Sequence, residues 1–135
     1  MISKRNTSLL AFGLGVLAFT LYMQHRAHGL QIGDSSEYVL SAASHSLIHP
    51  PGYPIYSMLL SLLGSMSNPD TLYAAVSGFS ALCAALSVVL LFFVIQHLSQ
   101  SLFVALALSL TWMLHPMHLR TALDAEVFAL HHLFS

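Results

Sequence analysis

Charged residues are scarce in this sequence. Of its 135 residues only 7% are charged, whereas 56% are hydrophobic and the mean hydropathy is +0.75. Soluble domains carry about 25% charged residues, so this composition predicts an integral membrane protein. Between Asp70 and Arg120 there are 49 consecutive residues without a charge. Such a stretch is long enough for two helices of about 20 residues, the length needed to cross a bilayer.

Basic residues and cysteine are also nearly missing. Four dispersed cations cannot neutralise a nucleic-acid backbone, which excludes a nucleic-acid partner. A single cysteine, Cys83, cannot form an internal disulfide. The sequence has no Gly-rich phosphate loop, no Gly-x-Ser-x-Gly elbow and no HExxH string. Nucleotide binding of the soluble type, serine hydrolysis and zinc proteolysis therefore have no support in the sequence. The cations are Lys4, Arg5, Arg26 and Arg120.

The apolar runs predict an all-α integral membrane protein, a polytopic helical bundle that forms one unit over residues 1–135. We expect about three spanning helices, and Pro116 should end or kink the third. Residues 24–70 form a first outer loop, and residues 121–135 begin a further helix. The expected spans are residues 8–23, 71–97 and 102–116.

Lys4 and Arg5 precede the first span, which favours a cytoplasmic N-terminus. The same run could be the core of a signal peptide, but Arg26 lies beside the only small-residue site, which cleavage signals disfavour. Counting spans from a cytoplasmic start places the first loop and the final segment on the extracytoplasmic face. The acids of the loop and those after Arg120 should then share one compartment.

Two elements are expected in the outer loop. Residues 34–47 have polar and apolar faces at helical spacing and should lie along the membrane interface. The apolar piece 55–66 would extend only about 20 Å as a helix and cannot cross unaided. We interpret it as re-entrant or interfacial. If it crossed, the two groups of acids would lie on opposite sides of the membrane.

Three motifs carry a family resemblance: GDSSEY, then HPPGYPIY, then TALDAEVFALHHLF after an uncharged pair of helices. In this order they resemble the start of a polytopic glycosyltransferase family, long catalogued as of unknown function, whose vertebrate relatives are protein O-mannosyltransferases of GT-C architecture. The resemblance covers nearly the whole chain, and the HPPGYP turn is its most specific part. Where we expect the family to have an Arg and an Asn, the chain has Tyr73 and Ala75.

The resemblance implies transfer of a sugar, such as mannose, from a polyprenyl- or dolichyl-phosphate carrier to a hydroxyl of a protein or glycan acceptor. Transfer would take place on the extracytoplasmic face of a bacterial inner membrane or the endoplasmic reticulum, among membrane lipids and without a tightly bound cofactor. Family members have many more spans. We therefore expect this chain to be an N-terminal fragment that is inactive without the remainder of the enzyme.

Asp34 is the candidate general base, because attack by a hydroxyl on an anomeric carbon needs a carboxylate to accept the proton. The alternative is that Asp34 and Glu37 form a capping box at a helix start. Glu126 is costly on an apolar stripe unless it is paired or functional, and Arg120 could contact a phosphate or anchor the chain at headgroups. The candidate catalytic acids are Asp34, Glu37 and Glu126, and the candidate substrate-binding residues are His49, Tyr53 and Arg120.

Two further alternatives remain. The nine histidines include pairs near residues 115–118 and 131–132, but Pro116 interrupts the first pair and no cysteine joins them, so we predict no metal site. The HPPGYP turn could simply reverse the chain rather than aim His49 and Tyr53 at a ligand. A non-catalytic membrane subunit or small transporter-like module is the rival function, with its small residues packed against a partner.

Overall fold

The computed structural model describes residues 4–26, 34–46, 53–64, 66 and 68–134. In this part of the chain the regular elements are seven α-helices, which confirms the predicted all-helical class. The helices are α1 (Lys4–His25), α2 (Ser35–Ser44), α3 (Pro54–Ser61), α4 (Pro69–Ser99), α5 (Leu102–Met113), α6 (Pro116–Leu123) and α7 (Val127–Phe134).

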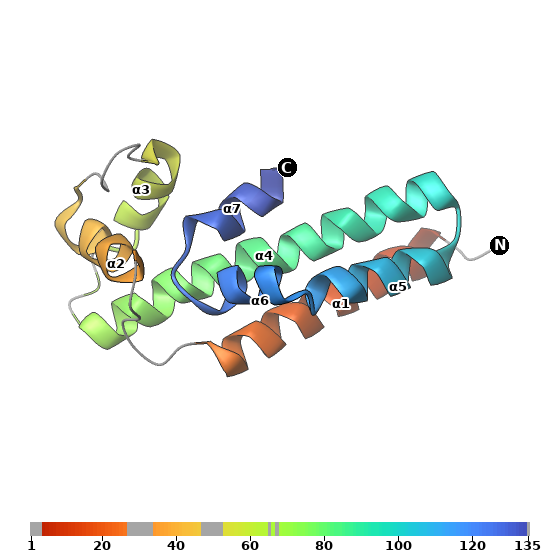
Figure 1. Cartoon of the computed structure of the whole chain (residues 1–135), viewed down its shortest axis with the longest axis horizontal. Helices are drawn as coiled ribbons and strands as arrows, with labels where there is room; N and C mark the ends of the chain where they lie inside the picture. The colour runs from red at the N-terminus through yellow and green to blue at the C-terminus, as the bar shows by residue number, and fades with distance from the viewer. Residues whose placement is uncertain (1–3, 27–33, 47–52, 65, 67, 135) are drawn as a thin grey trace.

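The long helix α4 is the centre of the bundle (Figure 1). α1 runs antiparallel to it, and α5 returns along it after a tight turn. Small side chains permit this close packing, because Ala18 of α1 and Ala81 and Ala84 of α4 are fully buried. Gly15 lies so near Val89 that a Cβ on the glycine would meet the valine methyl at 2.8 Å. The absence of a side chain at position 15 therefore sets how closely α1 approaches α4.

Two helices are long and apolar enough to cross a membrane, within Arg5–His25 and Asp70–Ser99. The pair α5 and α6 passes the same test together, but it bends by 60° at the break before Pro116. The two or three spans agree with the predicted membrane bundle, and the expected kink at Pro116 is confirmed. α1 and α4 each extend beyond the predicted bounds.

Local signals explain where α4 begins and how the bend is held. Asn68 caps α4, because its Oδ1 accepts hydrogen bonds from the backbone N–H groups of Asp70 at 2.8 Å and Thr71 at 3.4 Å. At the bend, Pro116 has no N–H to donate and the helical ladder is interrupted. The buried hydroxyl of Tyr22 on α1 donates to the carbonyl of Met113 at 3.0 Å.

α2 and α3 form a hairpin at the end of the bundle where α1 finishes and α4 starts (Figure 1). α3 has only eight residues, shorter than the predicted apolar piece 55–66, and extends about 12 Å. It is therefore too short to cross a bilayer. The hairpin buries Tyr38, Ala42, Tyr56 and Leu60. It exposes the large apolar side chains Leu40, Ile55, Met58 and Leu62.

The predicted helix 121–135 is wrong in its bounds. Residues up to Leu123 belong to α6, and α7 starts only at Val127. Between them the chain is extended, with Asp124 at φ −124° and ψ 171°. We call Asp124, Ala125 and Glu126 the acidic corner. The corner turns the chain back over α4, so that α7 packs on the same helix as α6.

Candidate functional site

The acidic corner is held on α4 by hydrogen bonds between residues far apart in sequence. The hydroxyl of Tyr73 on α4 donates to Asp124 Oδ1 at 2.8 Å. The same oxygen accepts the backbone N–H of Ala125 at 2.7 Å. Two donors on one carboxylate oxygen fix both the side chain and the backbone that follows it.

A serine two helical turns along α4 holds the other side of the corner. The backbone N–H of Glu126 donates to Ser80 Oγ at 3.1 Å, and the Ser80 hydroxyl lies 3.2 Å from the carbonyl oxygen of Glu126. Ser80 is buried, with 1% of its surface exposed. The hydroxyl therefore satisfies backbone groups that would otherwise be unpaired where the helices are interrupted.

Glu126 is half-buried, and its surroundings raise the pKa of its carboxyl. Burial is the largest cause, followed by the negative charges of Asp124 and Asp34, while the positive charge of Arg120 acts in the opposite direction. The structure therefore brings Asp34 from the first loop and Glu126 from the final segment into one electrostatic neighbourhood. Arg120 belongs to the same group.

Asp34 precedes α2, but its side chain does not cap the helix among the described residues. Its backbone carbonyl accepts hydrogen bonds from Glu37 N at 2.9 Å and Tyr38 N at 3.0 Å, and its side chain is exposed. The capping-box alternative requires the Asp34 carboxylate to bond to the first turn, so it is wrong for Asp34. The Asp34 carboxylate does not have that role, and its charge acts on Glu126.

Two tyrosines lie between the acids and the hydrophobic core, and sequence reasoning did not single them out. Tyr38 and Tyr56 meet edge to face, with ring centroids 5.4 Å apart, and each is 1% exposed. Burial raises the pKa of Tyr38, and the charges of Glu126 and Asp34 raise it further. Tyr38 is thus a neutral hydroxyl beside both carboxylates.

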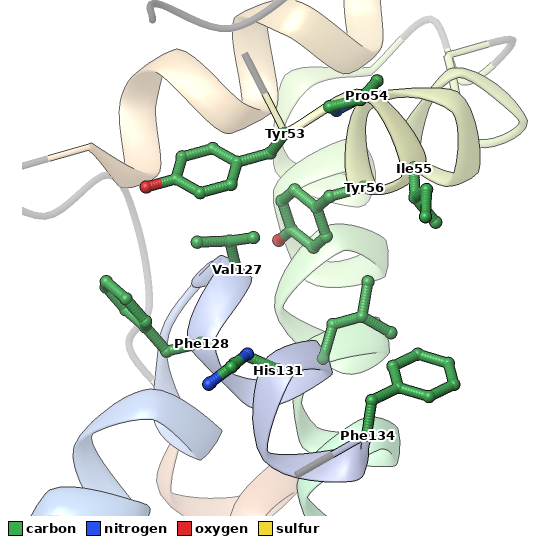
Figure 2. A pocket seen from close by; sticks show the side chains of 9 residues that line it. Tyr53, Pro54, Ile55, Tyr56, Val127, Phe128, His131 and Phe134 are labelled. Atoms are coloured by element: carbon green, nitrogen blue, oxygen red, sulfur yellow. The ribbon is translucent and has the colours of Figure 1, made fainter. Parts of the chain in front are cut away.

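An apolar pocket of about 380 Å³ opens between α3 and α7, next to the acidic corner. Figure 2 shows Tyr53 and Tyr56 on one side and the α7 side chains across from them. The hydroxyl of Tyr56 has no hydrogen-bond partner within normal geometry in the described structure, although Ser80 lies beside it. The lining residues are Tyr53, Pro54, Ile55, Tyr56, Val127, Phe128, Leu130, His131 and Phe134.

The structure places the three predicted substrate-binding residues differently. Tyr53 lies on the pocket wall and has a left-handed backbone, with φ 35°, at the start of α3. Arg120 is exposed on α6 and acts on Glu126. His49 lies outside the described residues. Sequence reasoning missed the α7 wall of the pocket, because its residues follow an ordinary apolar pattern.

Four of the nine histidines, at positions 115, 118, 131 and 132, lie in an aromatic cluster with Trp112. Trp112 contacts His118 and His132, with ring centroids 4.9 and 5.6 Å away. His118 is fully buried, and the Tyr22 ring meets it edge to face. Among the described residues no group of three or more His, Cys, Asp or Glu could hold a metal ion. The cluster packs α5, α6 and α7 together beside α1.

Comparison with known proteins places this arrangement in a family. Residues 34–135 match the family described as "Protein O-mannosyl-transferase TMEM260 N-terminal domain". The chain belongs to this family. It is 28% identical over 127 residues to the protein O-mannosyl-transferase TMEM260 of Mus musculus. The match covers 94% of the chain but 18% of the mouse protein. No solved structure matches the chain.

Within the TMEM260 N-terminal family match lie all the acids described above, the pocket and the α4 residues that hold the corner. The apolar helices and the match to a transmembrane relative indicate an integral membrane protein. Tyr73, which the sequence presented as a departure from the expected family pattern, is the residue that binds Asp124.

Proposed function

We propose that this protein takes part in sugar transfer as a membrane glycosyltransferase, with Asp34 as the general base. The observation that carries the proposal is the exposed Asp34 carboxylate, which does not cap α2 and lies within electrostatic range of Glu126. Membership of an O-mannosyl-transferase family supports this assignment. Because the chain spans 18% of the length of the mouse relative, the complete active site would include residues beyond this chain.

In the proposed reaction an acceptor hydroxyl attacks the anomeric carbon of a lipid-linked sugar phosphate. The new bond joins the acceptor oxygen to that carbon, and the bond from the carbon to the phosphate oxygen breaks. The hydroxyl proton passes to Asp34, and the bonding electron pair leaves with the phosphate. Arg120 is the proposed cation for the leaving phosphate, because it is exposed and its charge acts on the Glu126 carboxyl.

Glu126 and Glu37 would support Asp34. Glu126 has a raised pKa and so keeps its proton to a higher pH than an ordinary carboxyl. When it is protonated it removes one negative charge from the neighbourhood of Asp34, the proposed base. Glu37 lies one turn along α2 and adds to the negative potential at Tyr38.

The pocket between α3 and α7 would receive the apolar part of the donor. A polyprenyl or dolichyl chain is a row of branched five-carbon units, and the pocket is lined chiefly by aliphatic and aromatic side chains. Its position beside the acidic corner would place the carrier phosphate near Arg120. The acceptor would come from a protein or glycan on the extracytoplasmic face, with mannose as the proposed sugar.

The rival function, a non-catalytic subunit or transporter-like module, depended on small residues of the second span being free to pack against a partner. In the structure these residues are already used inside the chain. Ala81 and Ala85 are 0% and 3% exposed, and Gly78 lies next to Met23 of α1. Ala81 and Ala85 are therefore not free to pack against a partner, which removes one of the two features behind the rival; the other was that its loop acids cap helices.

The test is Asp34→Asn in the protein at its full natural length, with Asp70→Asn as the matched control. Asp70 is an exposed acid in the first turn of α4, so its change also replaces a carboxylate by an amide. We expect Asp34→Asn to lower the rate of mannose transfer from a dolichyl-phosphate donor by about 100-fold or more, the usual contribution of a general base. Asp70→Asn should retain transfer.

Equal transfer by both variants would refute the assignment of Asp34 as base. Loss in both variants would indicate that a general loss of negative charge, rather than proton transfer at Asp34, controls the rate. Folding of each variant is measured in parallel by the protection of Cys83, which is buried in the bundle, from a thiol reagent.

A further inference from the structure

We propose that Tyr73 and Ser80 are positioning residues, which hold the acidic corner on α4 and so set where the Glu126 carboxyl lies. The use of this arrangement in catalysis rests on the proposed transferase function, whereas the arrangement itself does not. Neither residue was expected to take part in the site from its sequence, since Tyr73 and Ser80 lie within an uncharged span.

The first observation is the spacing of the two residues. Tyr73 and Ser80 are seven residues apart on α4, close to two helical turns, and so lie on the same face of the helix. They are 6% and 1% exposed. This face of α4 therefore carries two hydroxyls, those of Tyr73 and Ser80, and the acidic corner contacts both of them.

The second observation is that each hydroxyl bonds to a different part of the corner. Tyr73 binds the side chain of Asp124 at 2.8 Å, and Ser80 binds the backbone N–H of Glu126 at 3.1 Å. The corner has an extended backbone between two short helices, so it has no helical hydrogen-bond ladder of its own to fix it. The Glu126 Cα is therefore set from α4 rather than from α6 or α7.

The third observation concerns the placement of Asp34 relative to Glu126. Asp34 stands on a separate element, just before α2, and α2 packs on α3 and α4. No described hydrogen bond joins the side chains of Asp34 and Glu126, so their separation depends on how the hairpin and the corner are each held. The two hydroxyls of the 31-residue helix α4 fix the corner's side of that arrangement.

A distance measurement tests the proposal independently of enzyme activity. Spin labels are attached at Leu40→Cys on α2 and Phe128→Cys on α7, both exposed positions, in a Cys83→Ala background of the full-length protein. We expect Tyr73→Phe and Ser80→Ala each to lengthen and broaden the distance distribution between the labels. The two substitutions remove the hydroxyl that binds the corner and little else.

Tyr22→Phe is the matched control. It removes a buried tyrosine hydroxyl that also makes one long-range hydrogen bond, at 3.0 Å, but to Met113 at the α5–α6 bend. The control should leave the distribution between the labels unchanged. A second label pair at the opposite end, Leu9→Cys and Phe103→Cys, should not respond to Tyr73→Phe.

The pKa of Glu126 is a second measurement, and it would not change if Tyr73 served only the stability of the bundle. If the corner loosens, water reaches Glu126 and its pKa falls toward the ordinary value. Infrared titration of ¹³C-labelled glutamate, with the spectrum of the matching Glu126→Gln variant subtracted so that the difference belongs to Glu126, should show this fall in Tyr73→Phe. Tyr22→Phe should titrate like the parent.

Three outcomes would overturn the proposal. One is an unchanged distance distribution in both Tyr73→Phe and Ser80→Ala. Another is an equal change in Tyr22→Phe, which would mean that the bundle loosens as a whole. The third is additivity of Tyr73→Phe and Asp124→Ala in the distance measurement, because both remove the same hydrogen bond and residues that act through one hydrogen bond must be non-additive. Failure of the Asp34→Asn test alone would leave this proposal standing.

Discussion

The two ends of the bundle both contain polar breaks between helices, but they satisfy their polar groups in different ways. At the α4–α5 turn the hydrogen bonds are local: Ser99 Oγ donates to Ile95 O at 2.8 Å, and Ser101 Oγ accepts from Val104 N at 3.5 Å. At the acidic corner Tyr73 binds Asp124 across 51 positions of sequence. The turn needs only its own residues, whereas the corner exists only when the whole fold has formed.

This difference identifies the end at which function should be sought. A turn that satisfies itself can stop one helix and start the next without help from the rest of the chain. The corner instead depends on α4. Its acids lie next to an apolar pocket and within electrostatic range of Asp34, which precedes α2. Substitutions should therefore have site-wide effects at the corner end and local effects at the turn.

The largest effect is expected from Gly64→Ala, in the turn after α3. A Cβ at this position would collide with the backbone carbonyl oxygen of Ala42 on α2, which cannot move as a side chain can. We expect a loss of about 1 to 3 kcal/mol in the free energy of unfolding, together with displacement of α2 and loss of the proposed sugar transfer. Thermal unfolding and transfer assays measure the two effects.

Gly13→Ala is the control for this substitution. A Cβ at position 13 of α1 meets nothing within 4 Å, so the change should be neutral or stabilise the helix by up to about 1 kcal/mol. If Gly64→Ala proved as harmless as Gly13→Ala, the hairpin would not be held against the bundle as tightly as described.

A smaller effect is expected in the pH dependence of stability. Burial, Asp124 and Asp34 raise the pKa of Glu126, so the folded state binds this proton more tightly than the unfolded chain. Its contribution is fully present below the ordinary pKa of 4.5 and is lost as the pH rises through the folded value. Glu126→Gln should remove this loss. Melting temperatures of the variant and the parent should therefore be alike below pH 4.5 and differ increasingly above it.

If the parent and Glu126→Gln gave parallel curves across the whole pH range, Glu126 would not be in the buried, acid-rich environment that the structure shows. Arg120→Gln sharpens the test, because Arg120 opposes the rise in the pKa of Glu126. Its removal should raise that pKa further and move the loss of stability to a higher pH.

The smallest effect is expected at the opposite end, from Gln100→Gly. Gln100 ends α4 with a left-handed backbone, φ 54°, where glycine is the preferred residue. Relief of this strain should raise the free energy of unfolding by about 0.5 to 1 kcal/mol, with no change in sugar transfer. Chemical denaturation and the transfer assay check both. A loss of transfer here would show that the two ends are coupled.

The sequence predicted the helices and spans well, because the length of an apolar run directly reflects the thickness of the membrane. It also predicted that Asp34 and Glu126 share one end, which followed from counting spans and from leaving the piece 55–66 uncrossed. The extended corner at 124–126 was missed, since its residues are compatible with a continuing helix. A single break in a helix leaves no periodic signal.

The long-range contacts could not be predicted from one sequence. Tyr73 appeared only as a departure from an expected family pattern, and nothing local indicates that its hydroxyl meets Asp124. The pocket combines residues 53–56 with residues 127–134, and each segment alone resembles ordinary apolar helix. Such sites become visible only when the packing of α3 and α7 is known.

The bend between α5 and α6 has a consequence for the surrounding lipid. The 12 residues of α5 rise about 18 Å, well short of a hydrocarbon layer of about 30 Å. The chain turns by 60° after α5, so α6 does not continue the span along the same axis. If this pair is one span, the bilayer beside it would have to thin locally to match it, which would bring headgroups and water closer to the break. A lipid-borne substrate would then meet aqueous reagents inside a dimple, without having to rise out of its leaflet.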